Sequence, residues 1–306
     1  MNTVVHTSTD EPHALRAPNG EGRATALSEV LDELLPSYPY NSATQLHEYF
    51  GGRAVPRSYG ASCAWQSFEA GRLVAARTGA AVEYPADGRH VAALFPDADG
   101  LALLDPYLLH RTPLRLDRAA AEDGVVRQTV DAYPFRVRAD GSPAPSRVRA
   151  TWRLADDSVR LDYLRYSPRR GHNVLSRSFT LRPGTRLTEV PPPADRVRPL
   201  LLHPEQHSVS VRVVHPGERQ IAEVILPMAG RPTGVRADAA LLIGKDNQGA
   251  VSRHASSSFG RTAELVADAM GVPYEELVGF LLEAAALHRA AAPASLVLAD
   301  YPVEDE

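Results

Sequence analysis

A run of short segments that alternate apolar and polar residues occupies the middle of the chain, from about Val125 to Leu226. The segments are separated by turn signals such as DGSPAPS, ADDS and SPRRG, and they begin at Val125, Phe135, Arg147, Ser158, Val174, Ser208 and Arg219. Alternation with a period of two is typical of strands that have one buried and one exposed face. Strands of this kind assemble into antiparallel sheets or barrels, so the middle of the chain is expected to be β-rich.

The segments before this run follow a different pattern. Apolar residues recur every three or four positions from Ala24 to Leu35, which predicts a helix. A short helix is predicted from Ser42, as its N-cap, to Phe50, and a third begins at Cys63 and stops at Gly79. Three strands are then predicted over 80–84, 90–95 and 101–107, the last two forming a hairpin.

The last part of the chain returns to mixed structure. A strand is predicted over 235–244, followed by helices over 262–270 and 272–290. The fold class expected is therefore α+β. The predicted divisions are a disordered tail (1–22), a helical N-terminal part with the cysteine helix and the hairpin (23–110), a β-rich domain (111–235) and an α/β C-terminal lid (236–306).

Charge and hydropathy exclude two classes of partner. The 306 residues include 33 Lys plus Arg against 37 Asp plus Glu, a formal net charge of -4, so there is no basic excess to neutralise a nucleic acid backbone. No segment approaches the ~18 to 20 consecutive apolar residues that span a bilayer. The first residues carry acidic groups and prolines where a secretory signal has an apolar run, so neither a nucleic acid nor a membrane partner is expected, and a cytoplasmic location is.

The chain has a single cysteine, Cys63. One cysteine forms no intrachain disulfide and supplies no cysteine-rich zinc site, so Cys63 is either a small buried hydrophobe or a reactive thiol. The histidines of HPEQH at 203–207 lack the H-E-x-x-H arrangement of metalloproteases, and no metal site is expected.

Two further residues favour the interpretation of Cys63 as a reactive thiol. His90 begins one strand of the predicted hairpin and Asp105 ends the other, so the hairpin is expected to bring the two side by side. A thiol at a helix N-terminus is favoured as its thiolate by the helix dipole and by a neighbouring imidazolium. Asp105 would orient His90, and His90 would activate Cys63.

The segments CAW at 63–65 and HVAALFPDADGLALLDPY at 90–107 resemble the transglutaminase-like branch of the papain-like cysteine superfamily, in which an Asp in a Leu-Asp-Pro step follows the His by 15 residues. The arylamine N-acetyltransferases share this triad, and their order of helical part, β-rich middle and α/β lid is similar. Their Arg-Gly-Gly-Tyr-Cys and Asp-Val-Gly-Phe-Gly elements are replaced here by SYGASC at 58–63 and DPY at 105–107. The resemblance implies a papain-like or transglutaminase-like core with catalytic Cys63, His90 and Asp105.

The resemblance further implies acyl transfer through an acyl-Cys63 thioester, giving an amide from a thioester-activated acyl group and an amine. No bound cofactor is implied, and an acyl-CoA or acyl-carrier-protein thioester is the cosubstrate. A small-molecule amine or acyl substrate, and an acyl or peptidyl carrier protein, are the partners. The alternatives are a transglutaminase-like hydrolase or amidase, a cysteine protease, and a non-catalytic binding scaffold of the same fold.

Five residues are candidates for substrate binding: Tyr59, Trp65, Tyr107, Arg253 and His254. The favoured interpretation of Trp65 is a core residue of the cysteine helix, and that of Arg253 and His254 is part of an ordinary loop over 252–261. Arginines on the alternating strands, at 136, 138, 147, 149, 153, 160 and 165, are interpreted as a solvated sheet face on which an acidic carrier protein could dock.

Overall fold

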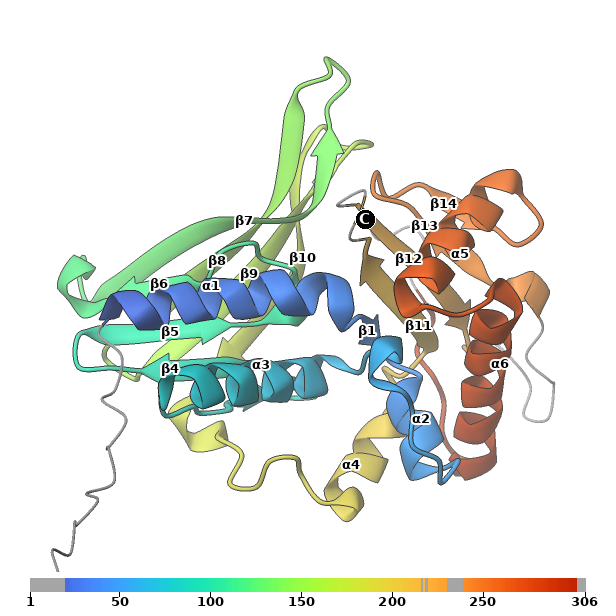
Figure 1. Ribbon diagram of the computed structural model, residues 1–306, viewed down its shortest axis with the longest axis horizontal. Helices are drawn as coiled ribbons and strands as arrows, with labels where there is room; N and C mark the ends of the chain where they lie inside the picture. Colours follow the sequence, from blue (N-terminus) through green and yellow to red (C-terminus); the bar gives the residue numbers. More distant parts are fainter. Residues whose placement is uncertain (1–19, 216, 218–219, 230–238, 302–306) are drawn as a thin grey trace, which may run out of the picture.

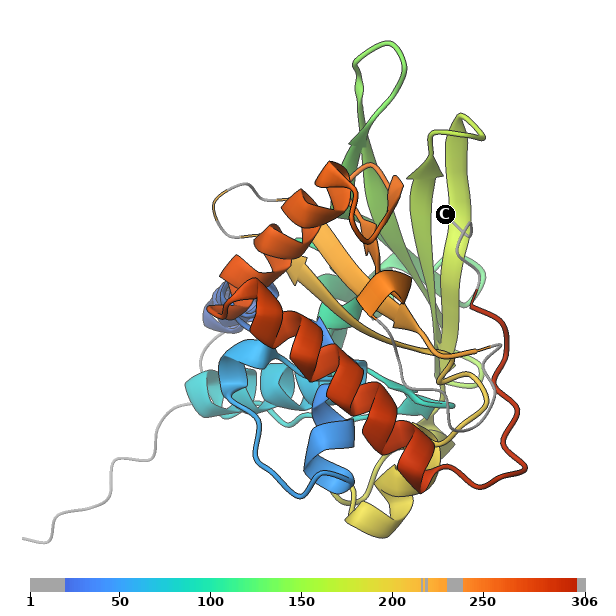
Figure 2. The same ribbon diagram turned by 90° about the vertical axis from the view of Figure 1, so that its right-hand side faces the viewer.

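The computed structural model describes residues 20–215, 217, 220–229 and 239–301, and within them the chain combines six α-helices with four antiparallel sheets (Figures 1 and 2). This confirms the α+β class. Within these residues the sheets stay open and none closes into a barrel. No helix in the described ranges combines the length and the apolar character needed to cross a bilayer.

Four long strands form one sheet in the order β10-β9-β8-β7. Their bounds are β7 Val125–Val137, β8 Pro143–Arg153, β9 Ser158–Ser167 and β10 His172–Leu181. Strand β7 joins two segments predicted separately, because the ladder continues past an irregularity between Ala132 and Phe135. The remaining two predicted segments form β11 (Ser208–Val214) and β12 (Ile221–Pro227), which belong to a different sheet.

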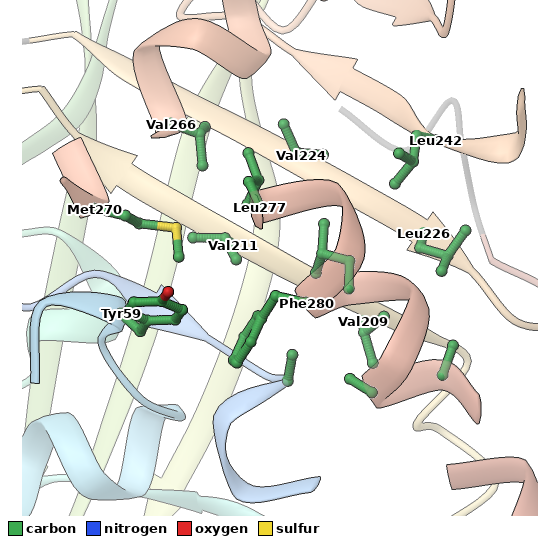
Figure 3. Close-up of a cluster of buried hydrophobic side chains, with 14 of the residues drawn as sticks. Tyr59, Val209, Val211, Val224, Leu226, Leu242, Val266, Met270, Leu277 and Phe280 are labelled. Atoms are coloured by element: carbon green, nitrogen blue, oxygen red, sulfur yellow. The ribbon is translucent and has the colours of Figure 1, made fainter. Parts of the chain in front are cut away.

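That second sheet has five strands in the order β1-β11-β12-β13-β14. Its other members are β1 Tyr40–Asn41, β13 Ile243–Lys245 and β14 Val251–Arg253. Helices α5 (Ser257–Met270) and α6 (Tyr274–Ala291) pack across one face of it (Figure 2). Figure 3 shows valines and leucines of β11 and β12 meeting Val266, Met270, Leu277 and Phe280 of these helices. The sheet thus takes strands from three of the four predicted divisions, whose boundaries stay a prediction.

The N-terminal part stacks two helices on a small sheet. Helices α1 (Gly20–Ser37) and α3 (Cys63–Thr78) lie side by side (Figure 1). The strands β4 (Ala93–Pro96), β5 (Gly100–Leu104) and β6 (Leu114–Asp117) form a three-stranded sheet against these helices, and β2 (Ala86–Asp87) pairs with β3 (His90–Val91). Two short helices complete the set, α2 (Thr44–Tyr49) and α4 (Ala194–Leu201).

Strands β4 and β5 are buried on both faces. Phe95 and Leu104 pack on the cluster beneath α1 and α3, whereas Leu94 and Leu103 pack on the cluster shared with the four-stranded sheet. Because side chains alternate between the two faces of a strand, successive residues of β4 and β5 pack into two different hydrophobic clusters. This fixes the register of the β4–β5 hairpin, because a slip by one residue would exchange every side chain between the cores. The strand predicted over 90–95 is divided, so that His90 lies in β3, which pairs with β2, and Asp105 directly follows β5.

Several sequence predictions differ from the structure. The predicted tail over 1–22 overlaps α1, which begins at Gly20, and residues 1–19 lie outside the described residues. The strand predicted over 80–84 is wrong, since the only pairing there is an isolated bridge between Glu83 and Leu94 in the described chain. Of the strand predicted over 235–244, residues 235–238 lie outside the described ranges, Ala239–Leu241 form a 3-10 turn, and β13 begins at Ile243.

Two more differences come from tertiary contacts. Ser42 is not the N-cap of α2, because its hydroxyl accepts a hydrogen bond from the Ser210 amide at 2.8 Å, and Ala43 takes the cap position. The segment 252–261, interpreted as a loop, contains the end of β14 and the start of α5, whose N-cap is Ser256.

Candidate active site

The loop that leads into α3 is fixed by three buried polar side chains from β1 and α2. Asn41 Nδ2 donates to the Tyr59 carbonyl at 2.8 Å, Thr44 Oγ1 donates to the Gly60 carbonyl at 2.9 Å, and Gln45 Oε1 accepts from the Ser62 amide at 3.0 Å. The three side chains belong to residues that are all less than 5 % exposed: 0 % for Asn41, 4 % for Thr44 and 1 % for Gln45. Because a buried polar group left unpaired is costly, these bonds select one path for the loop.

Cys63 is the first residue of α3, as predicted, and the extended Ser62 (φ -65°, ψ 167°) precedes it. The side chain is partly exposed, and its Sγ lies 3.7 Å from the carbonyl oxygen of Arg89. The first N–H groups of a helix have no partner within the helix and carry the positive end of its dipole. The thiol therefore lies at the positive end of the helix, where a reagent can approach.

His90 and Asp105 meet across the hairpin, as the spacing predicted. His90 Nε2 lies 2.7 Å from Asp105 Oδ2, and the two residues are 3 % and 0 % exposed. The other ring nitrogen of His90, Nδ1, is buried and has no partner at normal hydrogen-bond geometry among the described residues, although a weaker side-chain interaction with the Cys63 thiol acts on the ring. The carboxylate thus holds one ring nitrogen and leaves the other for proton transfer.

The surroundings of His90 shift its pKa strongly. Burial by itself lowers the pKa, since it removes water from the charged ring. The charge and hydrogen bond of Asp105, together with the Cys63 thiol, act in the opposite direction and raise the pKa of His90 from 6.5 to about 10. The ring therefore carries a proton at neutral pH, beside the thiol.

A second histidine holds Asp105 in place. His110 Nε2 accepts a hydrogen bond from the Asp105 amide at 2.9 Å, and its Nδ1 lies 2.7 Å from the carbonyl oxygen of Thr112. A ring nitrogen that accepts carries no proton, so His110 is neutral and its Nδ1 donates. Burial lowers the pKa of His110, which favours the same state. His110 is thus a positioning residue for Asp105.

Aromatic rings enclose His90. Phe179 of β10 stacks on the imidazole with ring centres 3.7 Å apart and planes 18° from parallel. Tyr107, in the turn after Asp105, lies 5.5 Å from the same ring, and Tyr40 of β1 lies 5.0 Å from Tyr107. Burial, Tyr107 and Cys63 together raise the pKa of Tyr40 above its usual value, which places Tyr40 near the thiol.

The five candidates for substrate binding lie in different places. Tyr107 is beside His90, whereas Tyr59 packs its ring 5.0 Å from Phe280 in the core (Figure 3) and its hydroxyl donates to Glu276. Trp65 packs between Tyr49 and Phe68. Arg253 ends the edge strand β14, and His254 Nε2 lies 3.2 Å from the Tyr274 hydroxyl. No hydrogen bond, ion pair or ring contact in the described residues joins Tyr59, Trp65, Arg253 or His254 to Cys63, His90 or Asp105, and their roles stay predictions.

The arginine face is exposed at most of the predicted positions. Arg138, Arg147, Arg149, Arg153 and Arg160 are exposed, and Arg165 is half-buried. Arg136 is the exception and corrects the interpretation, because it is 2 % exposed and its Nη1 donates to the Tyr166 carbonyl at 2.6 Å.

Five residues of this region were not predicted from the sequence: His110, Phe179, Tyr40, Arg177 and Arg212. Two of them left a signal: His110 ends the apolar stretch LLDPYLLH, and Arg212 interrupts the apolar strand SVSVRVV. Phe179 and Arg177 lie more than 70 residues after Asp105 on a strand with ordinary alternation, and nothing local distinguishes them.

Two cavities lie away from these groups, and the described residues contain no metal-binding cluster. No group of three or more His, Cys, Asp or Glu able to hold a metal ion is found among the described residues. One cavity of about 120 Å³ is lined by residues that include Trp152 and Arg182, and another of about 620 Å³ lies between β14 and α5. Neither is lined by Cys63, His90 or Asp105.

The chain matches no protein-family model, and no curated protein or solved structure matches it significantly. The function therefore has to be argued from the site.

Proposed function

We propose that the chain is a cysteine-dependent acyltransferase that makes an amide from a thioester-activated acyl group and an amine. The observation that carries the proposal is the partly exposed Cys63 at the start of α3, beside a buried His90–Asp105 pair in which the pKa of His90 is raised to about 10. The resemblance of residues 58–107 to the transglutaminase-like branch and to the arylamine N-acetyltransferases supports it, and with it a papain-like core.

Each group has a defined task in this mechanism. The Cys63 thiolate attacks the donor carbonyl, a bond forms between Sγ and the acyl carbon, and the donor thiolate leaves with the proton of His90. The Cys63 amide, one of the unpaired N–H groups of the first turn of α3, donates to the oxyanion. The amine then attacks the acyl carbon, its proton passes to His90, and the Cys63 thiolate is released.

The donor in this proposal is an acyl-CoA or a carrier-bound thioester, and the reaction takes place in the cytoplasm. Hydrolysis is the second candidate, because the partly exposed Cys63 would give water access to the same acyl-enzyme. The two candidates differ only in what attacks the acyl carbon, so adding an amine separates them.

The test is intact-mass measurement after incubation with acyl-CoA of several chain lengths. We expect one acyl adduct on the wild type, none on Cys63→Ala, and at least about 100-fold slower acylation of His90→Gln, a loss within the range of general acid–base catalysis. Adding an amine should convert the adduct to amide faster than water removes it, and removal by water alone would favour the hydrolase.

Iodoacetamide gives an independent control, since Cys63 is the only thiol it can modify. A thiolate held by His90 reacts near pH 6 much faster than a free thiol. No acyl adduct from any donor, together with alkylation no faster than that of a free thiol, would refute the enzyme and favour a non-catalytic scaffold.

A further inference from the structure

Two arginines from different sheets converge on the tyrosines beside the triad. Arg177 belongs to β10 and Arg212 to β11. The Arg177 side chain hydrogen-bonds to Tyr107, and the Arg212 guanidinium lies over the Tyr107 ring. The Tyr107 ring in turn lies 5.5 Å from that of His90. The two arginines bring cationic groups to the same place where Cys63 and His90 meet.

Arg212 is held by two aromatic rings and a carbonyl and has unused hydrogen-bonding capacity. Its guanidinium carbon lies 4.7 Å from the centre of the Tyr107 ring and 5.2 Å from that of Tyr40, and its Nη2 donates to the Tyr107 carbonyl at 2.5 Å. Its Nε is buried and has no hydrogen-bond partner among the described residues. A donor buried without a partner costs free energy unless a ligand accepts from it.

Arg177 reaches the same place because of an irregularity in β10. The ladder with β9 shifts register between Leu175 and Arg177, and such bulges redirect side chains. Two residues further, Phe179 stacks on His90. Residues two apart in a strand share a face, so Arg177 lies on the face of β10 that covers the triad. Its side chain stays accessible to solvent although protein surrounds much of it.

The local charges do not balance. Glu223 lies opposite Arg212 in the ladder of β11 and β12, and its negative charge contributes to the raised pKa of Arg177. No ion pair within the described chain joins Arg177, Arg212 or the neighbouring Arg89 to an acidic side chain. Arg89 and Arg177 also lower the pKa of His207, after burial as the larger cause. Asp105 is already paired with His90, so the two guanidinium groups and Glu223 together carry an excess of positive charge beside the thiol.

We propose that Arg177 and Arg212 bind a carboxylate of the reacting small molecule, which lies a few bonds from the acyl carbon or from the attacking amine. The inference rests on the proposed function, because it names the substrate class of the same site. A planar guanidinium pairs with a carboxylate through two parallel hydrogen bonds, which also fixes the orientation of the substrate. The phosphates of a CoA or carrier thioester lie at the far end of a long arm, away from a site so close to His90.

The first experiment needs no acyl transfer. Iodoacetate and iodoacetamide both alkylate Cys63, and they differ in carrying a carboxylate or a neutral amide. For Cys63 we expect the rate with iodoacetate divided by the rate with iodoacetamide to exceed the same ratio for 2-mercaptoethanol by about 10-fold or more. Hydrogen bonds between the arginines and the reagent carboxylate predict an effect of this size. Arg177→Gln and Arg212→Gln should return the ratio to that of the free thiol, and Arg177→Lys should retain part of the increase.

The matched control is Arg127→Gln, which removes one positive charge from an exposed position of β7. It should leave the ratio unchanged. Arg177 is accessible, so its variant tests the proposal even where Arg212→Gln fails to fold. A wild-type ratio equal to that of 2-mercaptoethanol, or an increase that survives both Arg→Gln substitutions, overturns the proposal.

The second experiment identifies which substrate carries the carboxylate. Succinyl-CoA is compared with butyryl-CoA in the formation of acyl-Cys63, and glycine with glycinamide in its aminolysis. A carboxylate preference of about 10-fold in one arm, lost in Arg177→Gln, assigns the group to the donor or to the acceptor. Acylation without a carboxylate preference for the donor or the acceptor overturns this inference but does not contradict the acyltransferase. No acylation by any donor refutes the acyltransferase. In that case the ratio of alkylation rates still decides whether the two arginines bind a carboxylate.

Discussion

Three neighbours hold the His90 ring in one orientation. Asp105 binds its Nε2 at 2.7 Å, Phe179 stacks on its face, and Tyr107 lies 5.5 Å away. The spacing of His90 and Asp105 was readable from the sequence, because one hairpin links them. The Phe179 stack was not, because β10 lies in a separate sheet that reaches the hairpin only after folding.

The raised pKa of His90 predicts how stability depends on pH. The folded pKa of about 10 exceeds the unfolded value of 6.5, so the folded state binds more protons between these values. This contribution is fully present below pH 6.5 and is lost as the pH rises through 10. We expect the free energy of unfolding to fall over this window by up to about 1.4 kcal/mol per pH unit.

Urea unfolding of the wild type and of His90→Gln between pH 6 and pH 10 measures this effect. The decrease should be steeper in the wild type, because other titrating groups are common to both proteins. Equal slopes would mean that His90 does not gain its proton through folding.

At the scale of elements, the loop before α3 decides where Cys63 stands. Gly60 has φ +74°, a conformation that favours glycine, and a Cβ there would collide with the backbone of Pro39. The same loop pairs Ala61 with Tyr40 of β1. The helix start is therefore tied to the edge of the five-stranded sheet.

Gly60→Ala should destabilise the protein by roughly 2 to 5 kcal/mol, about 1 to 2 from the backbone conformation and about 1 to 3 from the collision. It should also slow alkylation of Cys63, since the thiol would move away from His90. The matched control is Gly52→Ala, where φ is +67° but nothing lies within 4 Å of the added Cβ. Chemical unfolding and alkylation rates measure both, and equal effects at the two positions would contradict this account of the loop.

The elements themselves were predicted with uneven success for a physical reason. Helices α3 and α6 follow from apolar periodicity, and Gly79 ends α3 in a left-handed conformation. The two-residue strands β1 and β2 escaped prediction, because they carry no periodicity of their own. The helix α4 escaped prediction because it is eight residues long and contains Pro199, which disfavours a helix.

On the scale of the whole molecule, Asn247 joins the two large sheets. It lies in the turn between β13 and β14, its Nδ2 donates to the Phe135 carbonyl of β7 at 2.8 Å, and its Oδ1 accepts from the Ile221 amide of β12 at 3.2 Å. Arg177 and Arg212 come from these same sheets, so their approach to Tyr107 depends on contacts of this kind.

Asn247→Ala should lower the free energy of unfolding by about 1 to 3 kcal/mol, because it leaves two backbone groups without a partner. Gln248→Ala is the matched control, since the adjacent Gln248 accepts from the exposed Val137 amide at 3.1 Å and water can replace it. Urea unfolding should show the larger loss for Asn247→Ala. Losses of equal size would show that the partly buried contacts of Asn247 contribute no more than the exposed contact that Gln248 makes between the same sheets.

The sequence by itself determined the helical and alternating segments, the α+β class and the pairing of His90 with Asp105. These depend on neighbours two to four residues apart or on a single hairpin. Only the tertiary structure decided that β11 and β12 leave the long sheet, that Phe179 covers His90, and that Arg177 and Arg212 converge there. Such contacts join residues far apart in the chain, and they form because several half-buried faces have to be covered at once, which no local pattern specifies.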